Sequence, residues 1–185
     1  IKLFTKSIYK IYFVNSLNIK NIYLFIMINE LDNNIVRHMQ KGKYRDTIRL
    51  FSKPFDYKEF LFLIIILRLS NILSNENVKK IFLSVIFLFY FKNFFKRLRP
   101  FIVDKTIRNR SKSKLDYHSF PSGHAYISFL LASILYNKYQ VPVIYIVPIL
   151  VGYSRVYLGV HYPSDVIFGF IFSFIYDTIY DKFLS

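Results

Sequence analysis

The sequence has no cysteine among its 185 residues, which excludes disulfide bonds and thiolate metal sites and leaves the redox compartment open. Glycine is also scarce, with five residues, and none of them forms a glycine-rich phosphate-binding loop. The first residues contain no small-residue cleavage pattern of a signal peptide. No internal repeat and no long linker divide the chain, so its length predicts a single domain.

Large apolar side chains are abundant. Hydrophobic residues make up 54% of the chain and aromatic residues 20%, with 21 Phe and 16 Tyr. A soluble domain of this size rarely carries so many. Charged residues still account for 20%, and apolar blocks alternate with short basic blocks. This alternation predicts an all-α membrane protein in which several spanning helices are joined by tight loops.

The formal net charge of +15 can attract nucleic acid, anionic lipid headgroups or a phosphate-bearing substrate. For a chain this apolar, the pattern favours the membrane and the phosphate. The main polar charge run, 105–114, is interpreted as a loop between two helices, although it could also contact nucleic acid. It lacks the interleaved aromatic residues that nucleic-acid binding sites use, so we expect no nucleic-acid partner.

The N-terminal part of the chain is less apolar. Polar residues interrupt each apolar run within 1–26. We favour Met27 as the natural start, which makes 1–26 a non-native or weakly ordered extension and 27–185 the domain; a weak first spanning helix is the alternative. Between 30 and 56, apolar residues recur at helical spacing among basic ones. This pattern predicts an amphipathic helix at the bilayer surface, or an ordinary soluble helix.

Five spanning helices are expected after this segment. Their predicted ranges are 58–75, 79–97, 122–137, 141–156 and 163–180. Several of the apolar runs are shorter than the roughly 20 residues that a bilayer requires, so their polar ends must lie in protein or in the interface. Ser128 and Ala132, and likewise Gly169 and Ser173, lie four residues apart, either by chance or to allow close helix packing.

Three polar clusters occur at the ends of these helices. The first, Lys92 with Arg99 and Pro100, ends the second helix, where cations also serve as ordinary interfacial anchors. The second, Pro121-Ser122-Gly123-His124, opens the third helix. A helix start presents free N–H groups that suit an anion, and a histidine can donate a proton near neutral pH, although a plain capped helix start is the alternative.

The third cluster is Ser154-Arg155 followed by His161 and Asp165. The guanidinium of Arg155 matches the geometry of phosphate oxygens. His161 and Asp165 are four residues apart, so on a helical turn the carboxylate can accept from one ring nitrogen and leave a lone pair on the other. That arrangement activates a nucleophile, whereas the alternative is a buried polar pair without chemistry.

The direction of the helices brings the clusters together. The second helix ends on one face of the membrane, and the third helix starts from that face. The fourth helix returns to it, so we expect all three clusters to meet at one surface.

These motifs, Lys92-x6-Arg99-Pro100, Pro121-Ser122-Gly123-His124 and Ser154-Arg155-x5-His161-x3-Asp165, resemble the three-part signature of the type 2 phosphatidic acid phosphatases. That superfamily also includes undecaprenyl-diphosphate phosphatases, glucose-6-phosphatases and vanadium haloperoxidases. The resemblance covers about 28–182 and departs from the signature at no position. A short apolar chain fits a lipid phosphatase better than the longer, soluble haloperoxidases.

The resemblance implies an all-α helical bundle and hydrolysis of a lipid phosphate monoester or diphosphate without a metal or other cofactor. By the same resemblance, His161 forms a phosphohistidine, Asp165 orients it, and His124 protonates the leaving oxygen. The residues implied to hold the phosphate are Lys92, Arg99, Ser122, Gly123 and Arg155. A metal-free site is consistent with the chemistry, because three cations and a helix start can stabilise the charge of phosphoryl transfer.

Two other interpretations stay open at this point. One is a membrane protein that binds phosphorylated lipid without hydrolysing it. The other is a metal site, built from some of Asp116, His118, His124, His161 and Asp165. The basic flanks favour a cytoplasmic site, whereas the family resemblance favours a bacterial cell membrane with the site facing outward, which we adopt. The lipid substrate and the oligomeric state are not encoded in any pattern that we recognise.

Overall fold

In the part of the chain that the structure describes, the regular elements are helices, as predicted. The computed structural model describes residues 19–111 and 117–183. In chain order the elements there are α2 (Ile19–Met39), α3 (Arg45–Ser52), η1 (Lys53–Phe55), α4 (Tyr57–Leu69), α5 (Asn75–Phe95), α6 (Pro100–Val103), α7 (Gly123–Tyr139), η2 (Pro142–Tyr145), α8 (Ile146–Tyr157) and α9 (Pro163–Phe183). The all-α prediction is therefore confirmed, with helices close to all five ranges expected after residue 57.

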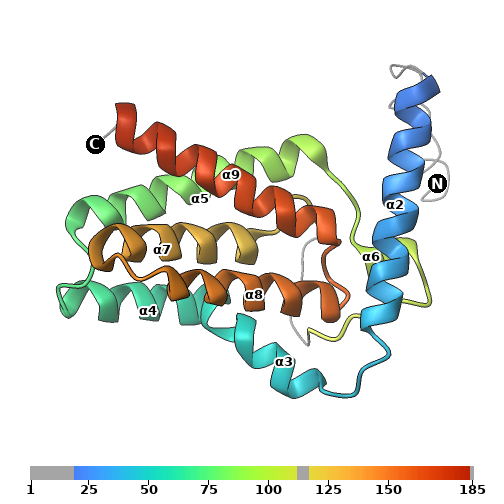
Figure 1. The fold of residues 1–185 in the computed structure, drawn as a ribbon, viewed down its shortest axis with the longest axis horizontal. Coiled ribbons are helices and arrows are strands. Elements are labelled where there is room, and N and C mark those ends of the chain that lie inside the picture. Colours follow the sequence, from blue (N-terminus) through green and yellow to red (C-terminus); the bar gives the residue numbers. More distant parts are fainter. Residues whose placement is uncertain (1–18, 112–116, 184–185) are drawn as a thin grey trace.

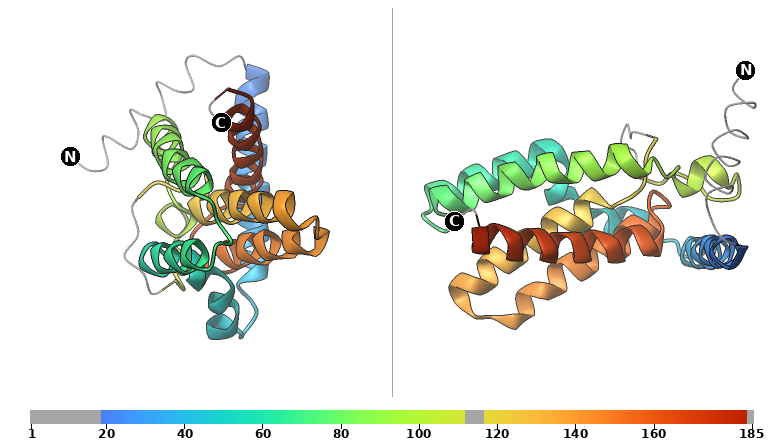
Figure 2. Two further views of the ribbon diagram at one scale, coloured as in Figure 1. Left: turned by 90° about the vertical axis from the view of Figure 1, so that its left-hand side faces the viewer. Right: turned by 90° about the horizontal axis from the view of Figure 1, so that it is seen from above.

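The long helices α4, α5, α7, α8 and α9 lie side by side in one bundle (Figure 1, Figure 2). Helix α2 crosses one end of that bundle at a steep angle. The main core lies between α4, α5, α7 and α9, where Tyr126, Leu130 and Tyr180 are almost fully buried. Aromatic rings of α5 and α9 pack across it, for example Phe87 against Tyr176. Burial of this surface is the main stabilising contribution to the fold.

Small residues allow helices to approach closely. The four-residue spacing of Gly169 and Ser173 predicted such an approach for α9. A Cβ at Gly169 would come within 2.9 Å of the Ser122 carbonyl oxygen, so α9 contacts the backbone at the start of α7. Gly152 has the same role between α8 and α9, because its Cβ would lie 2.6 Å from Val166. Both contacts lie towards the α2 end of the bundle and fix the spacing of helix ends there.

The end of α5 turns the chain back towards the bundle. Lys96 adopts a left-handed conformation with φ 47°, which ends α5 after Phe95. The chain that follows pairs with the segment before α7. The Ser119 N–H donates to the Arg97 carbonyl at 2.7 Å, and the Arg99 N–H donates to the Tyr117 carbonyl at 3.3 Å. The first two polar clusters are thereby joined through their backbones.

The single amphipathic helix predicted over 30–56 is wrong in its extent. The structure has the end of α2, a turn around Gly42, and then α3 and η1. A Cβ at Gly42 would lie 2.8 Å from the Tyr157 hydroxyl of α8, so the chain needs a glycine to pass this helix end. The prediction relied on spacing and missed this tertiary contact.

The predicted boundary after residue 26 lies inside α2, which runs unbroken from Ile19 to Met39. The rest of the proposed extension, 1–18, lies outside the described residues. Within the described ranges, no helix combines the length and the apolar character that crossing a membrane requires.

Candidate active site

One end of the bundle collects the three polar clusters. The C-terminal ends of α5 and α8 and the N-terminal ends of α7 and α9 all lie at the end crossed by α2 (Figure 1, Figure 2). Direct contacts show that the clusters meet. Nη1 of Arg99 lies 3.1 Å from Nε2 of His161. The Ser122 N–H donates to the Asp165 carbonyl at 3.0 Å. The expected convergence of distant motifs is therefore present.

His161 lies in the turn between α8 and α9 and is 2% exposed. Its Nε2 lies 3.1 Å from Nη1 of Arg99, which also donates to the Val160 carbonyl at 2.8 Å. Because a guanidinium can only donate, the Nε2 lone pair accepts this contact and the ring proton belongs on Nδ1. Burial lowers the pKa of His161 well below its ordinary value, and the charges of Arg99 and Arg155 lower it further.

Asp165 is fully buried in the first turn of α9. Its Oδ2 lies 3.6 Å from Nδ1 of His161, which is an ion-pair distance but too long for a hydrogen bond. The hydrogen bond expected from the four-residue spacing is therefore not formed, and Nδ1 has no hydrogen-bond partner among the described residues. Instead, Oδ2 accepts from the Tyr162 N–H at 2.8 Å, and Oδ1 accepts from Arg97 at 2.8 Å.

Two predicted phosphate-binding residues contain buried polar atoms without partners. Arg155 is 2% exposed; its Nη1 donates to the Ser52 hydroxyl at 3.2 Å, whereas its Nε has no partner in the described part of the chain. Ser122 occupies the N-cap position of α7 as expected, but its side chain caps no N–H, and its buried Oγ is likewise unpaired among the described residues. Such atoms are rare in folded proteins and indicate a polar group that binds there.

The remaining predicted site residues lie at the same end. Gly123 is the first residue of α7, and Lys92 lies in the last turn of α5, where its Nζ donates to the His118 carbonyl at 3.3 Å. The Ser122 N–H donates to the Asp165 carbonyl at 3.0 Å, so the second and third motifs are also connected by backbone.

His124 has a partner that the sequence did not reveal. Its Nε2 lies 2.9 Å from Oδ1 of Asp56, the residue that precedes α4. Burial tends to raise the pKa of the Asp56 carboxyl, but the hydrogen bond from His124 and the nearby positive charges outweigh it, so the pKa is lowered. Asp56 belongs to none of the three motifs, and only its place at a helix start hinted at a role.

Arg97 donates to Asp165, and Asp32 accepts from Arg97. Neither residue was predicted to belong to the site. The metal-site alternative gains no support in the described ranges, which contain no group of three or more His, Cys, Asp or Glu side chains placed to hold an ion. Asp116, one of its proposed ligands, lies outside those ranges.

Two phosphatases match part of the chain in sequence. It is 40% identical over 90 residues to a lipid A 4'-phosphatase of Porphyromonas gingivalis, an alignment covering 43% of this chain and 37% of the relative. It is 44% identical over 82 residues to an undecaprenyl-diphosphatase of Sulfolobus acidocaldarius, covering 40% of this chain and 37% of the relative. The chain thus spans little more than a third of the length of these relatives.

Two crystal structures have a similar fold. LpxE of Aquifex aeolicus superposes with a TM-score of 0.68 at 25% identity, covering 83% of this chain and 96% of that one. A transmembrane PAP2 type phosphatidylglycerolphosphate phosphatase of Bacillus subtilis gives a TM-score of 0.64 at 20% identity, covering 85% and 88%. The profile of the PAP2 superfamily matches residues 60–183, which contain all three motifs. The family expectation is confirmed: this chain belongs to the PAP2 superfamily.

Proposed function

We propose that this protein hydrolyses a phosphate monoester or diphosphate on a membrane lipid, through a phosphohistidine at His161 and without a metal. One observation carries the proposal. A buried, neutral imidazole lies between a guanidinium and a carboxylate, at the same end of the bundle as the unpaired polar atoms of Arg155 and Ser122. Phosphate oxygens would satisfy those atoms, and phosphorus would then lie within reach of Nε2.

The first chemical step is attack by the Nε2 lone pair of His161 on phosphorus, once the Arg99 guanidinium that contacts Nε2 has turned to a phosphate oxygen. A P–N bond forms as the bond from phosphorus to the leaving oxygen breaks, and that oxygen takes a proton from His124. The imidazole gains positive charge, which the carboxylate of Asp165 stabilises. A general acid such as His124 typically contributes about 10²–10⁴-fold to the rate.

In the second step, water attacks phosphorus on the intermediate. Neutral His124 accepts the proton of the water, and the P–N bond breaks to return a neutral His161 and free phosphate. The transferring phosphoryl group spreads its charge over three oxygens, so fixed cations stabilise it throughout. Lys92, Arg99 and Arg155 are the cations assigned to this role.

We propose that the bundle is embedded in the membrane. Large apolar side chains are exposed along its outer faces, including Phe62 of α4, Phe82 and Phe89 of α5, Ile149 of α8 and Phe174 of α9. Exposed apolar surface of this extent indicates contact with lipid or another protein. The similarity to a transmembrane phosphatase structure supports the lipid interpretation. We retain the outward-facing site in a bacterial cell membrane as part of the proposal.

The substrate class follows from the relatives. The names of the two partial matches refer to lipid A and to undecaprenyl diphosphate, both of which carry phosphate on a lipid. We therefore propose a lipid-linked phosphate or diphosphate and do not narrow the class further.

The test uses the full chain purified in detergent with a panel of lipid phosphates and diphosphates, in the presence of a chelator. We expect phosphate release that His161→Ala abolishes, and an acid-labile phosphoprotein in the wild type during turnover. Substrate binding without any phosphate release would instead support a non-catalytic lipid-phosphate-binding protein. Activity that the chelator removes would refute the metal-free chemistry.

A further inference from the structure

Helix α2 precedes the region matched by the PAP2 profile, yet its Asp32 reaches the proposed catalytic dyad through Arg97. We propose that Arg97 and Asp32 are positioning residues that hold the carboxylate of Asp165 in register with His161, so that α2 is part of the active site. The inference rests on the proposed phosphatase function and adds two residues that belong to none of the three motifs.

The guanidinium of Arg97 is held on several sides. Its Nη1 donates to Oδ1 of Asp165 at 2.8 Å, and its Nη2 donates to Oδ2 of Asp32 and to Oδ1 of Asn29, also at 2.8 Å each. Its Cζ lies 3.9 Å from the centroid of the Tyr162 ring, a cation–π distance. A planar fork with this many contacts has essentially one orientation, which a lysine could not reproduce.

Asp32 connects the same guanidinium to the first turn of α9. The Asp32 side chain is 6% exposed. Its carboxylate accepts from the Ser164 N–H at 3.2 Å and from the Ser164 hydroxyl. A carboxylate at a helix N-terminus is also favoured by the helix dipole. The turn of α9 that carries Asp165 is thus fixed from α2 as well as from the segment that follows α5.

This arrangement suits a positioning role. Arg97 occupies Oδ1 of Asp165, which leaves Oδ2 directed towards Nδ1 of His161 at 3.6 Å. The carboxylate is fully buried, so without a cation beside it the ionised form would be costly. Its orientation would then depend on the Tyr162 N–H bond to Oδ2, without the Arg97 contact to Oδ1. An Asp165 that was neutral or turned away could not stabilise the imidazole when it gains charge in the first step.

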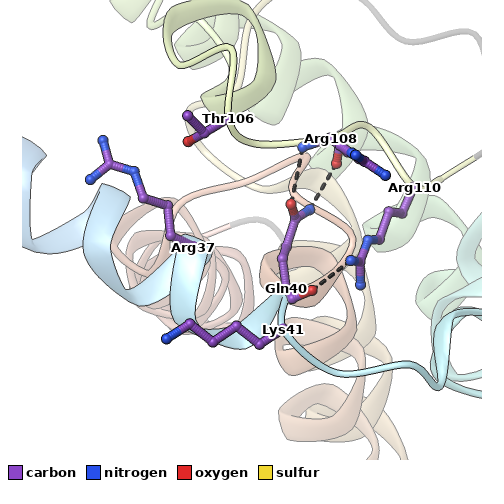
Figure 3. Close-up of a pocket in the computed structure, with 6 residues that line it drawn as sticks. All are labelled: Arg37, Gln40, Lys41, Thr106, Arg108 and Arg110. Carbon is purple, nitrogen blue, oxygen red and sulfur yellow. Dashed lines mark hydrogen bonds between the residues drawn. The ribbon is translucent and has the colours of Figure 1, made fainter.

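A second contact holds the C-terminal end of α2 against the segment that follows α6 and the end of α8. The Gln40 amide donates to the Arg108 carbonyl at 2.7 Å and accepts from the Arg108 N–H at 3.0 Å (Figure 3). It also lies 3.4 Å from the Tyr157 carbonyl, at the end of α8. Gln40 lines a shallow pocket of about 270 Å³ together with Arg37, whose guanidinium is 2.6 Å from Asp104. This outer ion pair anchors α2 without reaching Asp165 and so provides a matched control.

The experiment compares Asp32→Asn, Arg97→Gln and the double variant with Arg37→Gln, in the full chain in detergent. We expect kcat to fall about 10- to 100-fold in both single variants, the range found when the partner behind a functional histidine is removed. KM should change less than threefold, because neither residue contacts the phosphate-binding side chains. The double variant should lose much less than the product of the two single losses, since Asp32 acts mainly through Arg97 and only in part through Ser164. Arg37→Gln should keep wild-type kcat.

The melting temperature of each variant shows whether it is folded. If Arg97→Gln does not fold, Arg97→Lys replaces it, with an expected kcat between those of wild type and Asp32→Asn. Folded single variants with wild-type kcat would overturn the inference, as would losses confined to KM or losses that multiply in the double variant. An inactive wild type would refute the proposed function instead, so the two failures are distinguishable.

Discussion

Oδ1 of Asp56 lies 2.9 Å from Nε2 of His124, so a carboxylate from the start of α4 is paired with the proposed general acid. Burial of that imidazole and the neighbouring cations Arg155 and Lys92 oppose a positive charge on it. Asp56 has the opposite effect and favours the protonated form, which is the form that can donate to a leaving oxygen. The pair therefore offsets part of the cost of protonating a histidine in a buried and strongly cationic site.

Replacing Asp56 with Asn should therefore slow the first chemical step. We expect kcat to fall about 10- to 100-fold, which is within the contribution of a general acid. Without Asp56 the acid should lose its proton more easily, so the alkaline limb of the pH–rate profile should move to lower pH. Glu59→Gln is the matched control, because Glu59 is an exposed carboxylate in the same first turn. A substrate with a good leaving group needs little help from an acid, so its kcat should fall much less. Equal losses of kcat for this substrate and for the lipid phosphate would contradict a role of Asp56 in acid catalysis.

The low pKa of His161 predicts activity well into the acid range. Burial and the cations around the ring hold the pKa well below the ordinary value of 6.5, so the nucleophile stays neutral as the pH falls through that value. The pH dependence of kcat/KM reports groups of the free enzyme. As the pH falls, kcat/KM should therefore begin to decrease only below pH 6.5.

Arg99→Gln provides the comparison, because it removes the cation that contacts Nε2. The substrate titrates identically with the wild type and with Arg99→Gln. A shift of the acid limb between the two profiles must therefore come from the enzyme. We expect a lower rate together with an acid limb displaced to higher pH. An unchanged limb would show that another group controls it.

The convergence of the site could be predicted because it depends on topology. Helices that alternate in direction bring the C-terminal ends of α5 and α8 and the N-terminal ends of α7 and α9 to one end, whatever the details of packing (Figure 1). The element types followed from the apolar runs. The helix predicted over 141–156 begins instead at Ile146, after η2, which starts at Pro142. The predicted and observed bounds of these helices differ by several residues only at the ends that lie away from the site.

The support around the site could not be predicted in the same way. Asp32, Asp56 and Arg97 lie in segments that look like ordinary amphipathic or flanking sequence. The side-chain partners in these contacts are at least 65 residues away in the sequence, so no local pattern connects them. The same limit explains Gly42, where the break after α2 depends on a tyrosine of α8. Contacts of this kind depend on how helices pack, which neither periodicity nor a motif encodes.

Gly159 should tolerate no side chain, because it lies two residues before His161 with φ +72°. A Cβ there would lie 2.6 Å from the Arg108 carbonyl and against the Gln40 amide. Left-handed backbone alone costs roughly 1–2 kcal/mol for other residues. We expect Gly159→Ala to lower both the stability towards denaturant and the specific activity.

Gly123→Ala is the comparison for Gly159→Ala. Its Cβ would meet only the flexible end of Leu88, at 3.3 Å, so the loss of stability should be smaller. A Gly159→Ala variant with wild-type stability would mean that the turn before His161 relaxes without strain.

At the opposite end of the bundle, Lys80 of α5 forms a buried ion pair with Asp177 of α9 and a second pair with Asp181 at 2.6 Å. Its side chain is 5% exposed, and Ser133 of α7 donates to the same Asp177 carboxylate. Lys80→Met would leave that buried carboxylate without its cation, which costs about 3–5 kcal/mol in comparable cases. We expect a loss of this size in denaturant unfolding, with unchanged kcat for the folded fraction, because the cluster is remote from His161.

Two further variants separate the possible causes of that loss. Lys79→Met removes an exposed pair with Glu76 and should change stability by less than about 0.5 kcal/mol. The double variant Lys80→Met/Asp177→Leu removes both buried charges and should recover most of the stability, because apolar side chains can replace a buried ion pair. If the double variant were as unstable as Lys80→Met, packing around Lys80 would matter more than the unpaired charge.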